Sequence, residues 1–135
     1  MTRTLSRSVL LVTMVATTLA SAASAAEGEK KKGGGLSYLQ LPALTATVTR
    51  QSGRRGVMTV EVGLDVADSS LRDRAAASTP RLRDAYLQFL QTYAAALPPG
   101  SLPNPDAIGI ALQRSTDQVL AKPGAKLLLG SIMIN

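Results

Sequence analysis

The hydrophobic period changes once within the stretch from Val57 to Leu97, and this change constrains the fold more than any other feature of the chain. Every second residue from Met58 to Val66 is apolar, which is typical of a strand with one buried face. After Asp68 the apolar residues recur every three or four positions, which predicts a helix. These residues are Leu82, Tyr86, Phe89 or Leu90, Tyr93 and Leu97. We therefore expect a strand that leads into a helix, with the core built on both.

A second strand is predicted just before this stretch. Leu44, Ala46 and Val48 alternate with threonines, and threonine favours a half-buried strand. The segment Gln51–Gly56, QSGRRG, has the length of a hairpin loop and supplies glycines for positive φ angles. We therefore expect two antiparallel strands joined by a hairpin.

Capping residues and prolines predict a broken helix after the strand. Asp68-Ser69-Ser70 provides an N-cap for a helix over Leu71–Ala77. Thr79 provides a second cap, with Pro80 at the first helical position, so we expect a new helix to begin there and to run to about Leu97.

A further helix and a last strand complete the predicted fold. Asn104 is a candidate N-cap, followed by Pro105 and Asp106 in the first turn. The predicted buried face of this helix consists of Ile108, Leu112, Ser115 and Val119. The closing run Leu127–Asn135, LLLGSIMIN, is apolar at successive positions, which predicts a strand covered on both faces. The predicted class is α+β, with a small antiparallel-rich sheet of about three strands and two to three helices.

Histidine and cysteine are both absent from the 135 residues. The chain therefore has no imidazole or thiolate with which to bind a structural zinc ion, a haem or an iron–sulfur cluster, or to act as a histidine base or a cysteine nucleophile. We predict no catalytic residue, no metal site and no cofactor. One enzymatic hypothesis remains open, a small hydrolase or transferase that uses Glu61 and Asp65, which lie on the same face of the predicted strand.

The first 26 residues have the pattern of a signal peptide. Arg3 and Arg7 precede an apolar stretch from Val9 to Ala20, and the small residues SAASAA follow. This pattern predicts export and cleavage after Ala25 or Ala26, giving a periplasmic protein. The alternative is an uncleaved anchor in the inner membrane, with the rest of the chain facing the periplasm. Residues 27–37, rich in lysine and glycine, are predicted to be a flexible linker, and residues 38–135 the folded domain.

The formal net charge of +6 is spread along the chain rather than gathered in one block. The helical arginines at positions 72, 81 and 83 are expected to pair with Asp73 and Asp84. Stacking aromatics are lacking near the basic hairpin, so nucleic-acid binding is not predicted. The residues expected to be free for a protein partner, because they lie near a loop or a helix break, are Arg54, Arg55, Arg81 and Arg83.

The order of these elements, together with four sequence pieces, resembles the periplasmic domain of the flagellar basal-body-associated FliL family, of which the chain would be a divergent member. The pieces are YLQLPALTATV, VMTVEVGLDV, PRLRDAYLQFL and LQRSTDQVL, within residues 38–135. The resemblance implies a domain similar to the stomatin-type fold that is bacterial, exposed to the periplasm and membrane-associated. It also implies a scaffold role in motility, in which the domain assembles with itself and contacts the stator of the flagellar motor.

The leading hypothesis is therefore a non-enzymatic interaction module of the cell envelope. A second hypothesis, unrelated to motility, is an envelope protein that binds anionic lipid or an anionic polymer, which the positive charge favours.

Overall fold

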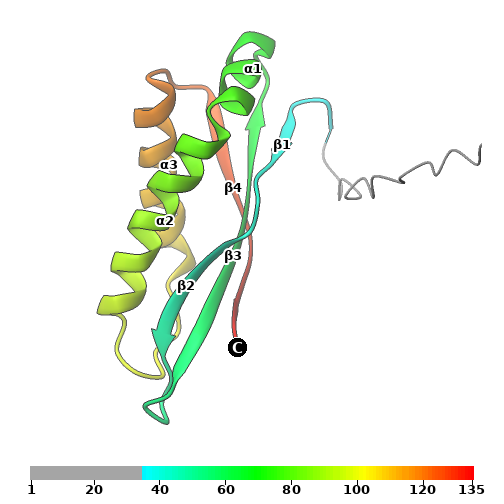
Figure 1. The fold of residues 1–135 in the computed structure, drawn as a ribbon. Helices are drawn as coiled ribbons and strands as arrows, with labels where there is room; N and C mark the ends of the chain where they lie inside the picture. The colour runs from blue at the N-terminus through cyan, green and yellow to red at the C-terminus, as the bar shows by residue number, and fades with distance from the viewer. Residues whose placement is uncertain (1–34) are drawn as a thin grey trace, which may run out of the picture. The chain divides into compact units, whose positions relative to one another are not determined.

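The computed structural model describes residues 35–135, and the predicted signal peptide and most of the predicted linker lie outside them. The described chain forms four strands and three helices (Figure 1). In chain order they are β1 (Tyr38–Gln40), β2 (Leu44–Thr49), β3 (Arg55–Val66), α1 (Ser69–Ala77), α2 (Thr79–Ala96), α3 (Pro105–Leu120) and β4 (Ala125–Ile134). The structure confirms the α+β class.

The sheet is antiparallel throughout and is organised around β3. On one side of β3, β1 and β2 lie end to end, with Leu39 opposite Leu64 and Leu44 opposite Val60. Pro42 lies in the short break between them and has no N–H to donate to a ladder. On the other side, β3 pairs with β4. The sheet is thus three strands wide along its length, and the predicted hairpin is confirmed.

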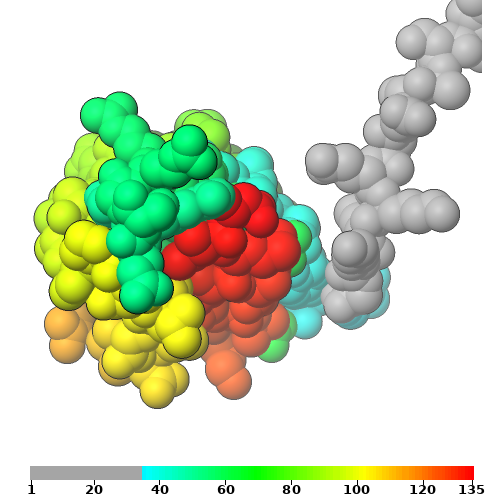
Figure 2. All heavy atoms as spheres, turned by 90° about the horizontal axis from the view of Figure 1, so that it is seen from below, coloured from blue at the N-terminus to red at the C-terminus, as the bar shows by residue number. Residues whose placement is uncertain are grey.

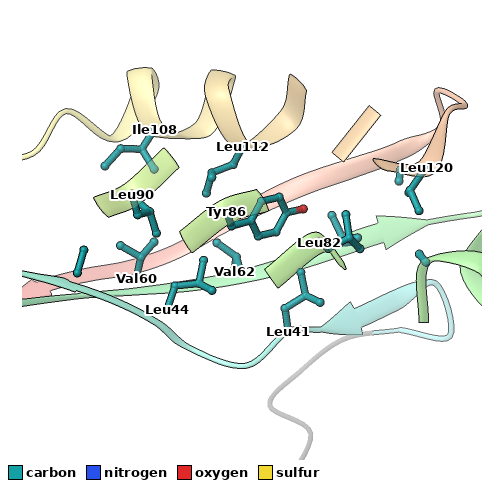
Figure 3. Close-up of a cluster of buried hydrophobic side chains, with 14 of the residues drawn as sticks. Leu41, Leu44, Val60, Val62, Leu82, Tyr86, Leu90, Ile108, Leu112 and Leu120 are labelled. Carbon is teal, nitrogen blue, oxygen red and sulfur yellow. The ribbon is translucent and has the colours of Figure 1, made fainter. Parts of the chain in front are cut away.

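All three helices follow β3, and α2 and α3 lie side by side on one face of the sheet (Figure 1). Helix α2 packs mainly on β2, and α3 packs on β4. In the core, side chains from the two helices meet those of the strands, and Tyr86 lies among them (Figure 3). The largest fully buried side chains are Tyr86, Leu44, Met58, Leu64, Leu82, Leu90, Ile108, Leu112, Leu120, Val60, Val62 and Val66. Aliphatic burial of this kind is the main favourable term in folding.

The helix starts agree with the capping prediction at two of three positions. Asp68 caps α1 by accepting a hydrogen bond from the Ser70 N–H at 3.2 Å, and Asn104 caps α3. The prediction that Thr79 caps α2 is wrong, because the helix already includes this residue. The Thr79 hydroxyl instead donates to the Ala75 carbonyl at 3.4 Å, so its side chain spans the break between α1 and α2.

The buried face of α3 differs from its prediction in the second half. Ile108 and Leu112 are buried as expected, but the next buried positions are Thr116 and Leu120 rather than Ser115 and Val119. A constant step of four residues drifts around the helix axis by about 40° per step, because one turn takes 3.6 residues. The buried face therefore runs obliquely around the helix. As a result, Thr116, a polar residue, is part of the core.

The sequence pattern left open whether Phe89 or Leu90 of α2 is the buried residue, and the structure shows that it is Leu90. Leu90 and Ala94 are buried, whereas Phe89 and Tyr93 are half-buried and pack against each other with ring centroids 5.8 Å apart.

The prediction for the last strand is wrong. β4 is an edge strand that pairs with β3 alone, and helices cover only one of its faces. Leu128 and Met133 are 38% and 48% exposed on the uncovered face. An apolar run is compatible with burial on both faces, but nothing in residues 35–135 packs on the second face of this one.

Candidate interaction surface

The face of the sheet opposite the helices has no covering element among the described residues, and we call it the open face. Three strands contribute to it in register. Thr45 lies opposite Thr59, which lies opposite Met133, and in the next row Thr47 lies opposite Val57. The residues of the open face are Tyr38, Gln40, Thr45, Thr47, Thr49, Arg55, Val57, Thr59, Glu61, Gly63, Asp65, Lys126, Leu128, Ser131 and Met133.

One end of the open face is closed by Tyr38, whose ring lies on Gly63. A Cβ atom at position 63 would overlap the Tyr38 ring, so only glycine permits this close packing. The Tyr38 hydroxyl donates to Gln40 Oε1 at 2.6 Å, which fixes the ring across the strand. Gly63 is therefore buried even though no helix covers it.

Large apolar side chains remain exposed elsewhere on the open face. Val57 is 47% exposed and lies one row from Met133, while Leu128 lies opposite Gly63. Between these two apolar spots, the Ser131 hydroxyl donates to the Glu61 carboxylate at 2.8 Å. The surface thus combines threonine hydroxyls with apolar side chains, a mixture suited to binding another surface.

The free edge of the sheet at β4 is partly blocked by a side chain from α3. Gln113 accepts a hydrogen bond from the Leu127 N–H at 2.7 Å and donates to the Ala125 carbonyl at 2.8 Å. The Gln113 side-chain amide therefore makes the two hydrogen bonds that a neighbouring strand would otherwise make with Leu127 N–H and Ala125 C=O. Sequence reasoning missed this residue because a glutamine on a helix has the pattern of an ordinary solvent-facing position.

Beyond Gln113 the edge of β4 is open. A groove lies there between β4 and the first turns of α3. The lining residues are Pro105, Asp106, Gly109, Ile110, Leu129 and Gly130. Figure 2 shows the last residues of β4, in red, at the molecular surface next to the yellow segment that leads into α3.

On the covered side, the core contains one polar pair. The Thr116 hydroxyl donates its only proton to the Leu112 carbonyl at 2.8 Å, so the Tyr86 hydroxyl donates to Thr116 at 2.5 Å. Burial raises the pKa of Tyr86, and the charge of Asp117 adds to this effect. The pair satisfies the buried hydroxyls, and its role is structural.

The four arginines proposed as partner contacts are all exposed, but they form two separate pairs. Arg54 and Arg55 lie at the β2–β3 hairpin, and Arg81 and Arg83 lie in the first turns of α2. The hairpin is joined to the far end of α2, because the Gly100 N–H donates to the Thr49 carbonyl at 3.2 Å. The two pairs are therefore separated by about 20 Å of helix, at about 1.5 Å per residue. They do not form one patch.

The predicted pairing of Arg72, Arg81 and Arg83 with Asp73 and Asp84 is wrong, because no ion pair joins these residues within the described part of the chain. Arg72 donates to the Val66 carbonyl at 2.9 Å, and Arg74 donates to the Leu120 carbonyl at 3.4 Å. Both guanidinium groups hydrogen-bond to the carbonyl of the last residue of another element, Val66 of β3 and Leu120 of α3. The alternation of charges in the sequence does not reveal these partners.

Within residues 35–135, a single ion pair joins Lys122 to Asp68 at 3.5 Å. The Ser70 backbone N–H, and to a smaller extent Lys122, hold the pKa of Asp68 below its usual value.

The two carboxylates considered for catalysis lie on the open face but are not side by side. Four residues of strand separate Glu61 from Asp65 by about 13 Å at roughly 3.3 Å per residue, and the Tyr38–Gly63 contact lies between them. Within the described part of the chain, no three His, Cys, Asp or Glu side chains gather as metal ligands would.

Comparison with known proteins adds no family. Neither the protein-family models nor the curated proteins contain a match to this sequence. Of the helices in residues 35–135, none has both the length and the apolar content needed to cross a bilayer.

Proposed function

We propose that this chain is a non-enzymatic interaction module of the bacterial cell envelope. The observation that carries the proposal is the division of the sheet into one face packed by helices and one open face with exposed Val57, Leu128 and Met133. Apolar side chains that stay exposed on a strand surface can form part of a contact with another macromolecule. The separation of Glu61 from Asp65 supports binding over two-carboxylate catalysis.

We further propose a place for the module in the periplasm, near the flagellar motor. The export pattern of residues 1–26 supports the compartment, and the resemblance of residues 38–135 to the FliL periplasmic domain supports the partner, a stator protein or another envelope protein. The observed order of strands and helices is compatible with that resemblance.

Cross-linking in intact cells tests this function. Cells that express the full chain are treated with a cross-linker, and captured envelope proteins are identified by mass spectrometry. We expect one recurrent partner, lost when Val57→Lys places a charge on the open face and retained in Gln118→Lys, an exposed control on α3. Capture that is equal for both variants, or turnover of an ester, phosphate or glycoside by purified protein, would contradict the proposal.

Binding to an anionic lipid or polymer is a second candidate, favoured by the exposed Arg50, Arg54 and Arg55 at one hairpin. Vesicle co-sedimentation tests it. Binding to vesicles with anionic lipid, none to neutral vesicles, and a loss in the double variant Arg54→Ala/Arg55→Ala would support this candidate. Equal pelleting with both kinds of vesicle would reject it.

A further inference from the structure

Beyond the part that Gln113 covers, the free edge of β4 lacks two of the devices with which proteins usually protect an edge strand. Such edges commonly contain charged residues or proline. The opposite edge has Pro42 between β1 and β2 and Arg50 directly after β2, whereas Leu127–Asn135 contains neither a charged residue nor a proline. Gln113 covers the edge only at Ala125 and Leu127.

The direction of the free backbone groups follows from the known hydrogen bonds. Leu127 N–H and Ala125 C=O face Gln113, so odd-numbered residues face outward in the first half of β4. In the second half, Asn135 exchanges two hydrogen bonds with Val57, so the even-numbered residues face outward there. The outward residues next to the middle of the strand are therefore Leu129 and Ile132.

The change of parity comes from a bulge. The register shifts so that Gly130 and Ser131 together lie opposite Glu61. As a result, Leu129 and Ile132 both face the helices, while Leu128 and Met133 both face the open side. The strand is thus symmetric about its own bulge, both in side-chain direction and in the direction of its free backbone groups.

We propose that β4 is a dimerisation edge, which pairs antiparallel with β4 of a second copy around a two-fold axis at Gly130–Ser131. This inference rests on the proposed binding role and names a second copy as the partner. In this register Leu129 lies opposite Ile132 of the second copy, and Leu128 lies opposite Met133 of the second copy. Side chains directly opposite in an antiparallel pair must share a face, and each of these pairs does.

The groove beside the edge has room for the second copy. Ile132 of the second copy, opposite Leu129, would enter the groove lined by Gly109 and Ile110, where Ile110 is 57% exposed. On the open face, Leu128 and Met133 would cover each other across the axis. The contact is isologous, so every apolar pair and every hydrogen-bonded pair occurs twice.

The first test is sedimentation of the protein purified from cells that express the full chain. We expect a dimer that Met133→Lys weakens at least about tenfold, because a lysine is then placed between apolar side chains at both ends of the contact. Gln88→Lys, at an exposed position of α2, the helix that packs on β2 rather than on β4, should leave the dimer unchanged. A wild-type monomer at the highest concentration reached, or equal effects of the two variants, would overturn the proposal.

The second test reads the register directly, because the chain has no native cysteine. Leu128→Cys and Met133→Cys proteins are mixed and oxidised. The mixture should form a disulfide-linked dimer, while each variant alone should not, because like positions are about 16 Å apart and a disulfide requires Cα atoms within roughly 7 Å.

A mixture of Leu128→Cys with Thr47→Cys is the control for head-to-tail pairing of the two sheet edges. A link in this mixture, or in either single variant, would reject the two-fold register. Because these tests use purified protein, their failure is distinct from a failure to capture a partner in the envelope.

Discussion

The two faces of the sheet are made by the same strands but differ in how deeply their side chains are buried. Along β3, the residues from Met58 to Val66 that face the helices are almost fully buried, while Val57 and Glu61 on the other face are exposed. On the covered side, the strand residues share one core with side chains from the helices, as Figure 3 shows for Val60 and Leu90. On the open side, only the Tyr38–Gly63 contact gives comparable burial. The difference lies in what packs on the strands, and it predicts where substitutions are costly.

The largest effect is expected for Leu90→Asp on the covered side. Leu90 is fully buried, and an unpaired carboxylate there costs several kcal/mol, which is comparable to the entire stability of a small domain. The expected result is an unfolded chain by circular dichroism.

The matched control for this variant is Gln91→Asp at the exposed neighbouring position, which should change the free energy of unfolding by less than about 0.5 kcal/mol. A cooperative, unchanged melting curve for Leu90→Asp would show that the covered face is wrongly assigned.

Gln113→Ala tests the boundary between the two regions. The variant loses the hydrogen bonds to Leu127 N–H and Ala125 C=O, and we expect a loss of about 1–2 kcal/mol in urea unfolding. The Leu127 amide should also exchange its hydrogen faster. Gln118→Ala, an exposed position on the same helix, is the control. Unchanged protection of the Leu127 amide would mean that Gln113 does not cover the edge.

Tyr86→Phe tests the polar pair of the covered side. Loss of the hydrogen bond to Thr116 should cost about 1 kcal/mol at neutral pH. The pKa of Tyr86 is raised by burial above the ordinary value of 10.0, so its contribution is complete below pH 10 and is lost as the pH rises through the raised pKa. Tyr86→Phe should therefore remove part of the alkaline loss of stability, which urea unfolding measured from pH 8 to 12 would show. Identical pH profiles would exclude this role for Tyr86.

The smallest effect on stability is expected for the exposed arginines. Arg54→Ala/Arg55→Ala and Arg81→Ala/Arg83→Ala should each change the free energy of unfolding by less than about 0.5 kcal/mol, because exposed charges contribute little to folding. Thermal melting measures this. The pairs should be compared separately in the envelope cross-linking assay, since they lie at opposite ends of α2. A large drop in melting temperature for either pair would reveal a structural role.

Local features of the fold could be predicted because neighbours in sequence determine them. The alternation of Leu44, Ala46 and Val48, the hairpin after Thr49 and the caps at Asp68 and Asn104 all depend on a few adjacent residues. The position of the helix break before Pro80 is likewise a local consequence of its missing N–H. These signals were sufficient for the α+β class and for the helix boundaries to within two residues.

The candidate surface depended on information that no local pattern contains. The run LLLGSIMIN has the same sequence whether it lies between two strands or at an edge, and only its pairing with β3 alone decides that Leu128 and Met133 remain exposed. Gln113 and Arg72 find backbone partners in other elements, and the bulge at Gly130–Ser131 arises from the register with Glu61. The sequence by itself therefore determined the strands, helices and caps, because they follow from short-range periodicity and hydrogen bonding. Only the tertiary structure decided which apolar residues are covered, since burial depends on which distant elements meet.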